Sequence, residues 1–233
     1  MSNEPRKEAT VIYEIEGNEI KQTKNIVQEY IVGSDTQISM PEFKMFTELC
    51  KVRKLNPFLK EAYLIKYGSQ PAQIVVGKDA ILKRAINNKQ FNGREQGIIV
   101  LTKGEEIIER KGTFKLDTDK LVGGWAKVYR KDWEYPTYIS VSFTEVAQTK
   151  ASGELNSNWN SKGATMVEKV ALMRGLRETF AEDLGAMIDE DEAWNTTDAR
   201  GSSQHIEKQK DIIEDVEIEE VHQANTTVNI DDI

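Results

Sequence analysis

Two kinds of residue in this sequence have the chemistry to act on or hold another molecule: clustered carboxylates, and cations that alternate with aromatic rings. The carboxylates are Asp117 and Asp119, in a D-x-D pattern, and the acidic run from Asp189 to Glu192. Clustered carboxylates can hold the metal ions of phosphoryl-transfer sites. Aspartates are also typical of turns, because their side chains bond to nearby backbone amides. We favour an exposed turn for the D-x-D pattern and a solvated helix end for the acidic run.

Other catalytic devices are missing. The nearest approach to a phosphate-binding loop, VGKD at 76–79, lacks both the leading glycine and the hydroxyl that would hold magnesium. The only histidines, His205 and His222, lie in a tail expected to be unfolded, which excludes a histidine base in the core. The single cysteine, Cys50, excludes a disulfide framework or a cysteine zinc site and favours a reducing compartment. We predict no catalytic residue, no metal and no cofactor.

Rings and cations alternate in the tract WAKVYRKDW. Since side chains along a strand alternate between faces, Trp125, Lys127, Tyr129 and Lys131 would share one face, with Trp133 beyond them. Such a face can hold phosphates and stack bases of a single-stranded nucleic acid, at roughly 1–3 kcal/mol per stacked base. The alternative is that Trp125 and Tyr129 belong to the core and the lysines border them.

A second group of cations lies along a long helix expected from about 165 to 184. At about 100° per residue, Lys162, Lys169 and Arg177 fall within an arc of roughly 80°, provided that the helix begins as early as Lys162. Arg174 lies toward the edge of this arc. The opposite side is apolar and is expected to pack inward, through Val167, Val170 and Ala171.

Two features of this helix leave alternatives open. Glu168 and Glu178 partly neutralise its charge, so the basic residues are equally compatible with an ordinary solvated face. Trp159 lies just upstream, in a loop rich in Ser, Asn and Gly. It either fills the edge of a core or stacks on a ligand.

Charge is unevenly distributed along the chain, whose net charge is -8. From Ala181 to Ile233, 16 acidic residues outnumber 3 basic ones, a net of -13; the preceding residues carry 28 basic and 23 acidic side chains, a net of +5. Acidic blocks of this kind usually stay solvated and act as interaction tails or shield a basic surface. We hypothesise one of these two roles for the tail.

The order of the expected elements indicates an α+β protein. A capping box, Ser39 with Glu42, precedes an apolar helical stripe and predicts a helix that ends near Asn56. Residues 11–20 predict a small hairpin, and a turn at 68–71 joins strands at 62–67 and 74–76. A helix at about 79–87 follows. An antiparallel meander comes next, with strands at 98–101, 107–110, 113–116, 125–131 and 138–143.

Length and hydrophobic content, 233 residues and 39%, suffice for one sizeable core. We predict a partly disordered N-terminal segment over 1–35, one core domain over 36–194 and a disordered tail over 195–233. The N-terminus has no apolar signal region and no run of 18 apolar residues occurs, so we expect neither export nor a membrane span.

Four sequence tracts follow one another along the chain: KLNPFLKEAYLIKY, IVVGKDAILKRAINNKQFNG, VYRKDWEYP and MVEKVALMRGLRETFAEDLGAMIDEDE. Together they resemble the phage recombination proteins of the Red beta (Bet) family, within the RecT-like single-strand annealing proteins. The resemblance spans roughly residues 40 to 193, about two thirds of the chain. It implies an ATP-independent protein that forms rings or helical assemblies and lays single-stranded DNA in a basic groove, where a complementary strand pairs to give an annealed duplex.

Carried over position by position, the resemblance implies phosphate contacts from Lys60, Arg130, Lys131, Lys169 and Arg177, and matches Trp159 to an aromatic that precedes the helix. The strand and helix patterns add three more cations. The full predicted DNA-binding set is therefore Lys60, Lys127, Arg130, Lys131, Trp159, Lys162, Lys169, Arg174 and Arg177.

The resemblance also implies a bacterial host cytoplasm as the location, self-assembly into a homo-oligomer, and a phage exonuclease and a host single-strand-binding protein as partners. The acidic tail departs from the small helical C-terminal domain that makes those contacts in Red beta. Glu168, beside Lys169, departs from a purely basic groove. Two other functions remain open: a metal-dependent nuclease built on the carboxylates, and a single-strand-binding protein that does not anneal.

Overall fold

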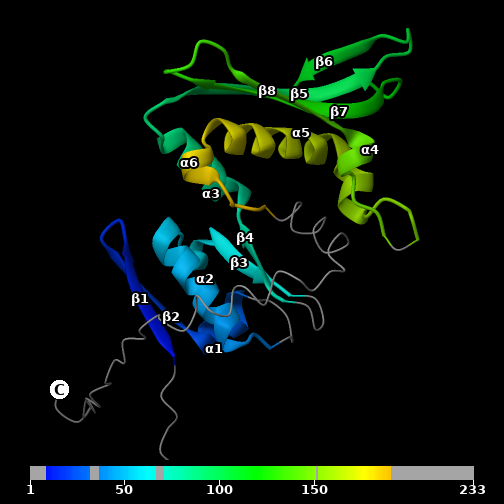
Figure 1. The fold of residues 1–233 in the computed structure, drawn as a ribbon. Coiled ribbons are helices and arrows are strands. Elements are labelled where there is room, and N and C mark those ends of the chain that lie inside the picture. The colour runs from blue at the N-terminus through cyan, green and yellow to red at the C-terminus, as the bar shows by residue number, and fades with distance from the viewer. Residues whose placement is uncertain (1–8, 32–36, 67–70, 151, 190–233) are drawn as a thin grey trace, which may run out of the picture. The chain divides into compact units, whose positions relative to one another are not determined.

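A computed structural model describes residues 9–31, 37–66, 71–150 and 152–189 (Figure 1). It has the expected α+β class, with antiparallel sheets and one long helix. The described residues divide into two compact units, with the boundary after Ile74. The tail from residue 190 and most of the turn predicted at 68–71 lie outside the described residues.

The first unit contains the predicted hairpin and the predicted capped helix. Strands β1 (Thr10–Ile15) and β2 (Asn18–Thr23) pair antiparallel around Glu16 and Gly17, both at positive φ. The helix, α2 (Met40–Arg53), ends three residues before Asn56. Shorter elements complete the unit: α1 (Lys24–Ile26), the π-helical turn η1 (Val27–Ile31), the 3-10 turn η2 (Pro57–Leu59) and β3 (Ala62–Ile65), which pairs with β4 (Gln73–Val76).

Buried side chains tie α2 to the hairpin. The Tyr13 hydroxyl donates to the Leu55 carbonyl oxygen at 3.0 Å and accepts from the Gln22 amide at 2.5 Å. Cys50, on the inner side of α2, is fully buried, and burial raises the pKa of its thiol to about 12. The thiol is therefore protonated and unreactive at neutral pH.

Glu42 holds the start of α2 to two other segments. Its carboxylate accepts from the Ser39 and Ala72 backbone N–H groups at 2.7 Å each, and Lys66 Nζ lies 3.0 Å away. Burial opposes ionisation of this carboxyl, but these hydrogen bonds outweigh it and lower its pKa to about 2. The ionised form therefore stabilises the fold.

We expect Glu42→Gln to lower the free energy of unfolding at pH 7 by about 2 kcal/mol. Because the folded-state pKa is depressed, this stabilisation is complete above the unfolded pKa of about 4.5 and disappears as the pH falls toward 2. Urea unfolding at pH 7 and at pH 3 measures the difference. Glu14→Gln, on the exposed side of β1, removes the same charge and should change stability by less than about 0.5 kcal/mol. An equal loss for both variants would contradict this account.

The second unit is built on a four-stranded antiparallel sheet in the order β6-β5-β7-β8. Its strands are β5 (Phe91–Leu101), β6 (Ile107–Lys111), β7 (Lys120–Arg130) and β8 (Thr137–Ser142). A simple meander would place β6 beside β7, but β7 instead pairs with the far side of β5. The strand expected at 113–116 is wrong: this segment belongs to the connection that crosses from β6 to β7.

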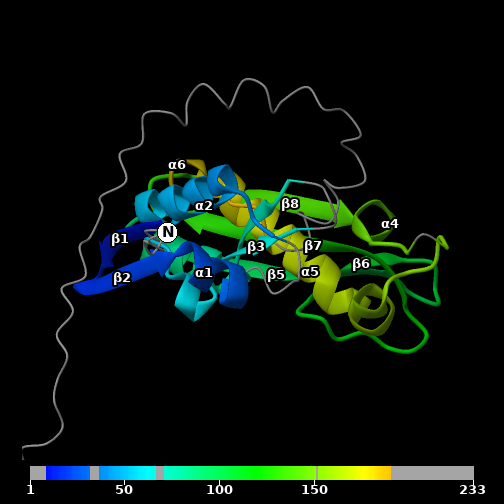
Figure 2. The same ribbon diagram turned by 90° about the horizontal axis from the view of Figure 1, so that it is seen from below.

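The long helix, α5 (Ser157–Thr179), packs on one face of this sheet (Figures 1 and 2). It begins eight residues earlier than predicted, because the Asn156 side chain caps it by accepting from the Trp159 N–H at 3.0 Å. Glycines permit the close approach: a Cβ at Gly124 of β7 would lie 2.5 Å from the Val167 carbonyl oxygen of α5. As predicted, Val167, Val170 and Ala171 are buried.

Shorter helices flank α5 in the second unit. They are α3 (Lys78–Asn87), α4 (Phe143–Val146) and α6 (Ala181–Leu184), so the helix expected to run unbroken to Leu184 is interrupted at Phe180. After α6 the chain returns beside β4, where the Val76 N–H donates to the Ile188 carbonyl oxygen at 2.9 Å. In the portion that the structure describes, no helix has the length and apolar character needed to cross a membrane.

Candidate nucleic-acid interface

The predicted alternation of rings and cations along β7 is present on the sheet face opposite α5. Lys127 Nζ lies 5.4 Å from the centroids of both the Trp125 and the Tyr138 rings. Trp125 is buried, however, and its indole N–H donates to the Arg110 carbonyl oxygen at 3.2 Å. Tyr129 donates to Glu95 at 3.1 Å. On this face Lys127 is partly accessible, while the Trp125 ring serves the core, as the alternative interpretation proposed.

Arg130 ties the end of β7 to the junction of α5 and α6. Its guanidinium lies 2.5 Å from the Glu182 carboxylate and 3.0 Å from that of Asp132, and it stacks near the rings of Trp133 and Phe180. The hydrogen bond to Asp132, and to a lesser extent the one to Glu182, raises the pKa of the Arg130 guanidinium. Only 11% of the side chain is exposed. The structure gives Arg130 two acidic neighbours that a DNA phosphate would have to displace.

Lys131 and Lys60 are exposed and lie outside regular strands. The Lys131 ammonium donates to the Lys89 carbonyl oxygen at 3.0 Å, just beyond the end of β7. Lys60 belongs to the first unit, where it follows η2 with a positive φ of 58°. The other eight predicted residues belong to the second unit.

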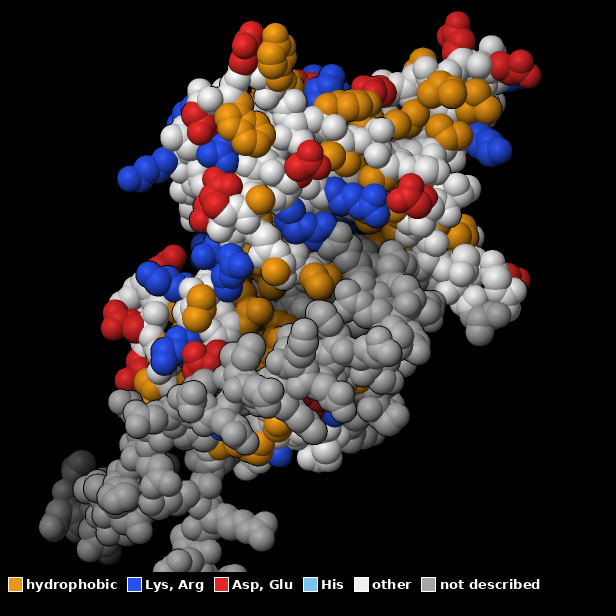
Figure 3. All heavy atoms as spheres, in the orientation of Figure 1, with side chains coloured by type: hydrophobic (Ala, Val, Ile, Leu, Met, Phe, Trp, Pro, Cys, Tyr) orange, Lys and Arg blue, Asp and Glu red, His pale blue; other side chains and the backbone are white. Residues whose placement is uncertain are grey.

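Three of the predicted cations on α5 are engaged within the protein. Lys169 Nζ lies 3.6 Å from the buried Asp189 carboxylate, and Arg177 donates to the Met187 carbonyl oxygen at 3.1 Å. Arg174 lies 3.4 Å from Glu145. Through these contacts with Asp189 and Met187, Lys169 and Arg177 also hold the segment after α6 against α5. Figure 3 shows basic and acidic side chains interspersed over the visible face.

Lys162 does not continue the helical arc on which it was placed. Its backbone is non-helical, with φ −132° and ψ 30°, so α5 bends there. Trp159 lies in the turn before the bend and is 1% exposed, packed edge-on against Phe143 at a centroid distance of 5.7 Å. In this structure Trp159 fills a core edge, and a base could stack on it only after the ring became exposed.

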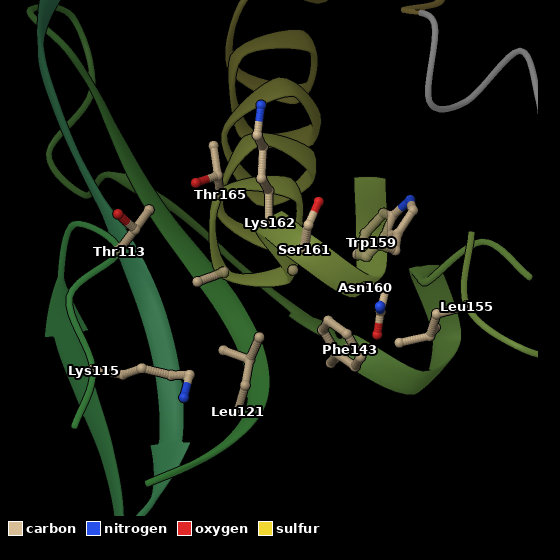
Figure 4. A pocket seen from close by; sticks show the side chains of 12 residues that line it. Thr113, Lys115, Leu121, Phe143, Leu155, Trp159, Asn160, Ser161, Lys162 and Thr165 are labelled. Carbon is tan, nitrogen blue, oxygen red and sulfur yellow. The ribbon is translucent and has the colours of Figure 1, made fainter. Parts of the chain in front are cut away.

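The bend creates a pocket of about 360 Å³ on the second unit (Figure 4). Thr113 and Lys115 contribute one side, from the connection between β6 and β7, and α5 contributes the other. The lining includes two lysines and no carboxylate. The residues that line it are Thr113, Lys115, Leu121, Phe143, Leu155, Trp159, Asn160, Ser161, Lys162, Gly163, Ala164 and Thr165. Sequence analysis missed Lys115, because we assigned its segment to a strand.

The D-x-D segment forms the turn that we favoured, but only one of its two carboxylates is exposed. Asp119 is buried, accepts from the Leu116 backbone N–H at 3.0 Å and pairs with Arg110 at 2.8 Å. Asp117 is exposed in the turn. Across the described ranges, no group of three or more His, Cys, Asp or Glu side chains is arranged to hold a metal ion.

Comparison with known proteins gives one family. The model described as "RecT family" matches residues 17–213, more than four fifths of the chain. No curated protein matches the sequence. The matched segment includes the whole second unit, the first unit from residue 17 to residue 74, and all nine of the predicted DNA-binding residues.

Proposed function

The chain belongs to the RecT family, and from that premise we propose that it holds one DNA strand in a basic groove and anneals it to its complement without ATP. Proteins of this family bind single-stranded DNA and anneal it during recombination, and are not enzymes in the usual sense. The match over residues 17–213 is the observation that carries the proposal.

Annealing requires positioning and no bond chemistry. A strand held by its phosphates keeps its bases free, so a second strand can pair with it. Exposed lysines that form no ion pair within the described residues support this role, among them Lys115, Lys131 and Lys162. The structure gives the competing nuclease less support, because Asp119 is occupied by its turn and by Arg110.

Assembly, partners and location complete the proposal. Both edges of the four-stranded sheet, β6 and β8, lack a further strand in the described part of the chain, and a neighbouring copy is one way to cover such edges. We propose a ring or helical homo-oligomer that works in the bacterial cytoplasm. A phage exonuclease would supply the single strand and a host single-strand-binding protein would hand it over.

An annealing assay with complementary labelled oligonucleotides tests the function and separates the three alternatives. We expect the purified full-length chain to accelerate duplex formation equally with and without ATP and magnesium, and to leave the strands intact. Protection of strands without faster pairing would indicate a binding-only protein. Magnesium-dependent cleavage that Asp119→Asn abolishes would indicate a nuclease. Either of these results would overturn the proposal.

A further inference from the structure

We infer that the pocket at the bend of α5 receives one nucleotide unit of the DNA, with a phosphate held by Lys115 and Lys162. This inference rests on the proposed function and deepens it. It adds a specific binding residue, Lys115, and shifts the expected grip on DNA from the C-terminal half of α5 to its bend.

Charge is the first argument for this site. Lys115 and Lys162 line the same pocket, both are exposed, and neither forms an ion pair in the described portion of the chain. By contrast, Lys169, Arg174 and Arg130 each have a carboxylate within 3.6 Å. A DNA phosphate that approaches those residues must displace an internal partner, whereas at the pocket it meets unpaired ammonium groups.

The remaining lining completes the chemistry of a nucleotide site. Three side chains offer hydroxyl or amide donors, from Thr113, Asn160 and Thr165. The Ser161 hydroxyl also lines the pocket, but it donates to the Ser157 carbonyl oxygen at 2.7 Å. Phe143 and Leu121 form an apolar wall suited to a sugar or a base edge (Figure 4). The volume, about 360 Å³, lies at the small end of ligand sites, which run from about 300 to 1,000 Å³. It therefore fits one nucleotide better than a paired duplex.

The fold explains why these groups meet. The segment after β6 is not a strand, so Lys115 does not belong to the sheet and lies across the pocket from α5. The non-helical backbone at Lys162 bends α5 beside the same pocket. Asp119 fixes the end of the connection, through the Leu116 N–H and Arg110.

Fluorescence anisotropy of a labelled oligothymidylate, titrated at several salt concentrations, tests the inference. We expect the double substitution Lys115→Gln with Lys162→Gln to weaken binding on the order of tenfold at low salt. The slope of log K against log salt should become shallower by about 0.7 for each phosphate that the variant no longer neutralises. Lys103→Gln removes an exposed lysine that does not line the pocket, and should leave the slope unchanged.

Two sources of the phosphate are distinguished by repeating the titration with 5′-phosphorylated and unphosphorylated oligonucleotides of equal length. An internal backbone phosphate predicts the same penalty for both. A strand terminus predicts a penalty only for the phosphorylated one. If the double variant and Lys103→Gln bind both oligonucleotides with the same slope, the pocket is not the site. A wild-type chain that neither binds nor anneals would instead defeat the proposed function itself.

Discussion

Gly124→Ala is expected to lower the free energy of unfolding of the second unit by about 3 kcal/mol. A Cβ at this position would lie 2.5 Å from the Val167 carbonyl oxygen and 2.8 Å from its carbon, and 3.1 Å from the Glu168 backbone nitrogen. All three atoms belong to the backbone of α5, so no side-chain rotation can relieve the clash. The helix would have to move off the sheet.

Because α5 carries one wall of the pocket, the same substitution should also reduce DNA binding. Thermal or urea unfolding, followed by oligonucleotide titration below the transition, measures both effects. Gly104→Ala is the matched control: an added Cβ would meet only the Thr102 hydroxyl, at 3.8 Å, in an exposed turn. We expect that control to change stability by less than about 0.5 kcal/mol. Equal stability of the two variants would show that α5 does not approach β7 so closely.

The sequence correctly predicted several elements, because the residues that signal each of them lie near one another in the chain and contact one another in the structure. The Ser39 and Glu42 capping box does begin α2, and the Gly17 turn does close the first hairpin. The strand predicted at 113–116 failed for a nonlocal reason. Alternation in that segment resembles a strand, but the connection to β7 crosses the sheet there and Asp119 binds the Leu116 N–H in a turn.

Long-range pairing also extended elements whose own sequences are weak. Strand β5 begins at Phe91 rather than Ile98, because the polar stretch between them pairs with β7, with Arg94 opposite Val128. The early start of helix α5 has one local and one more distant cause: the Asn156 side chain caps it, and Trp159 packs against Phe143 of α4. The start of β5 is stabilised by residues of β7 that lie far along the chain. The periodicity of the β5 sequence alone therefore could not predict where the strand begins.

At the candidate site, too, the sequence pattern predicted local geometry but not the contacts between residues that are distant in the chain. The pattern correctly placed Trp125 and Lys127 on a shared face, where the cation lies over the ring. It could not reveal which cations already had partners, since Lys169 meets a carboxylate 20 residues later in the chain, at Asp189. A predicted DNA contact can therefore also be a structural tie, and experiments on such residues must separate the two roles.

Lys169→Met is expected to destabilise the second unit by about 3 kcal/mol, because it removes a cation that lies 3.6 Å from the Asp189 carboxylate, which is 1% exposed. Asp189→Asn should recover part of that loss when the two substitutions are combined. The reason is that the neutral amide does not require the ammonium group. Urea unfolding of the wild type, both single variants and the double variant gives the coupling energy, which we expect to be about 2 kcal/mol.

DNA binding by the same four proteins separates the two roles of Lys169. If the lysine contacts phosphate, the double variant should bind with a shallower salt slope, by about 0.7, even though much of its stability is restored. Asp189→Asn alone should then bind more tightly than the wild type, because it removes a carboxylate that competes with phosphate for the lysine. Wild-type slopes in both the double variant and Asp189→Asn would make Lys169 a purely structural residue. In that case the predicted DNA contact on α5 would fall to Lys162, at the bend, which has no carboxylate partner among the described residues.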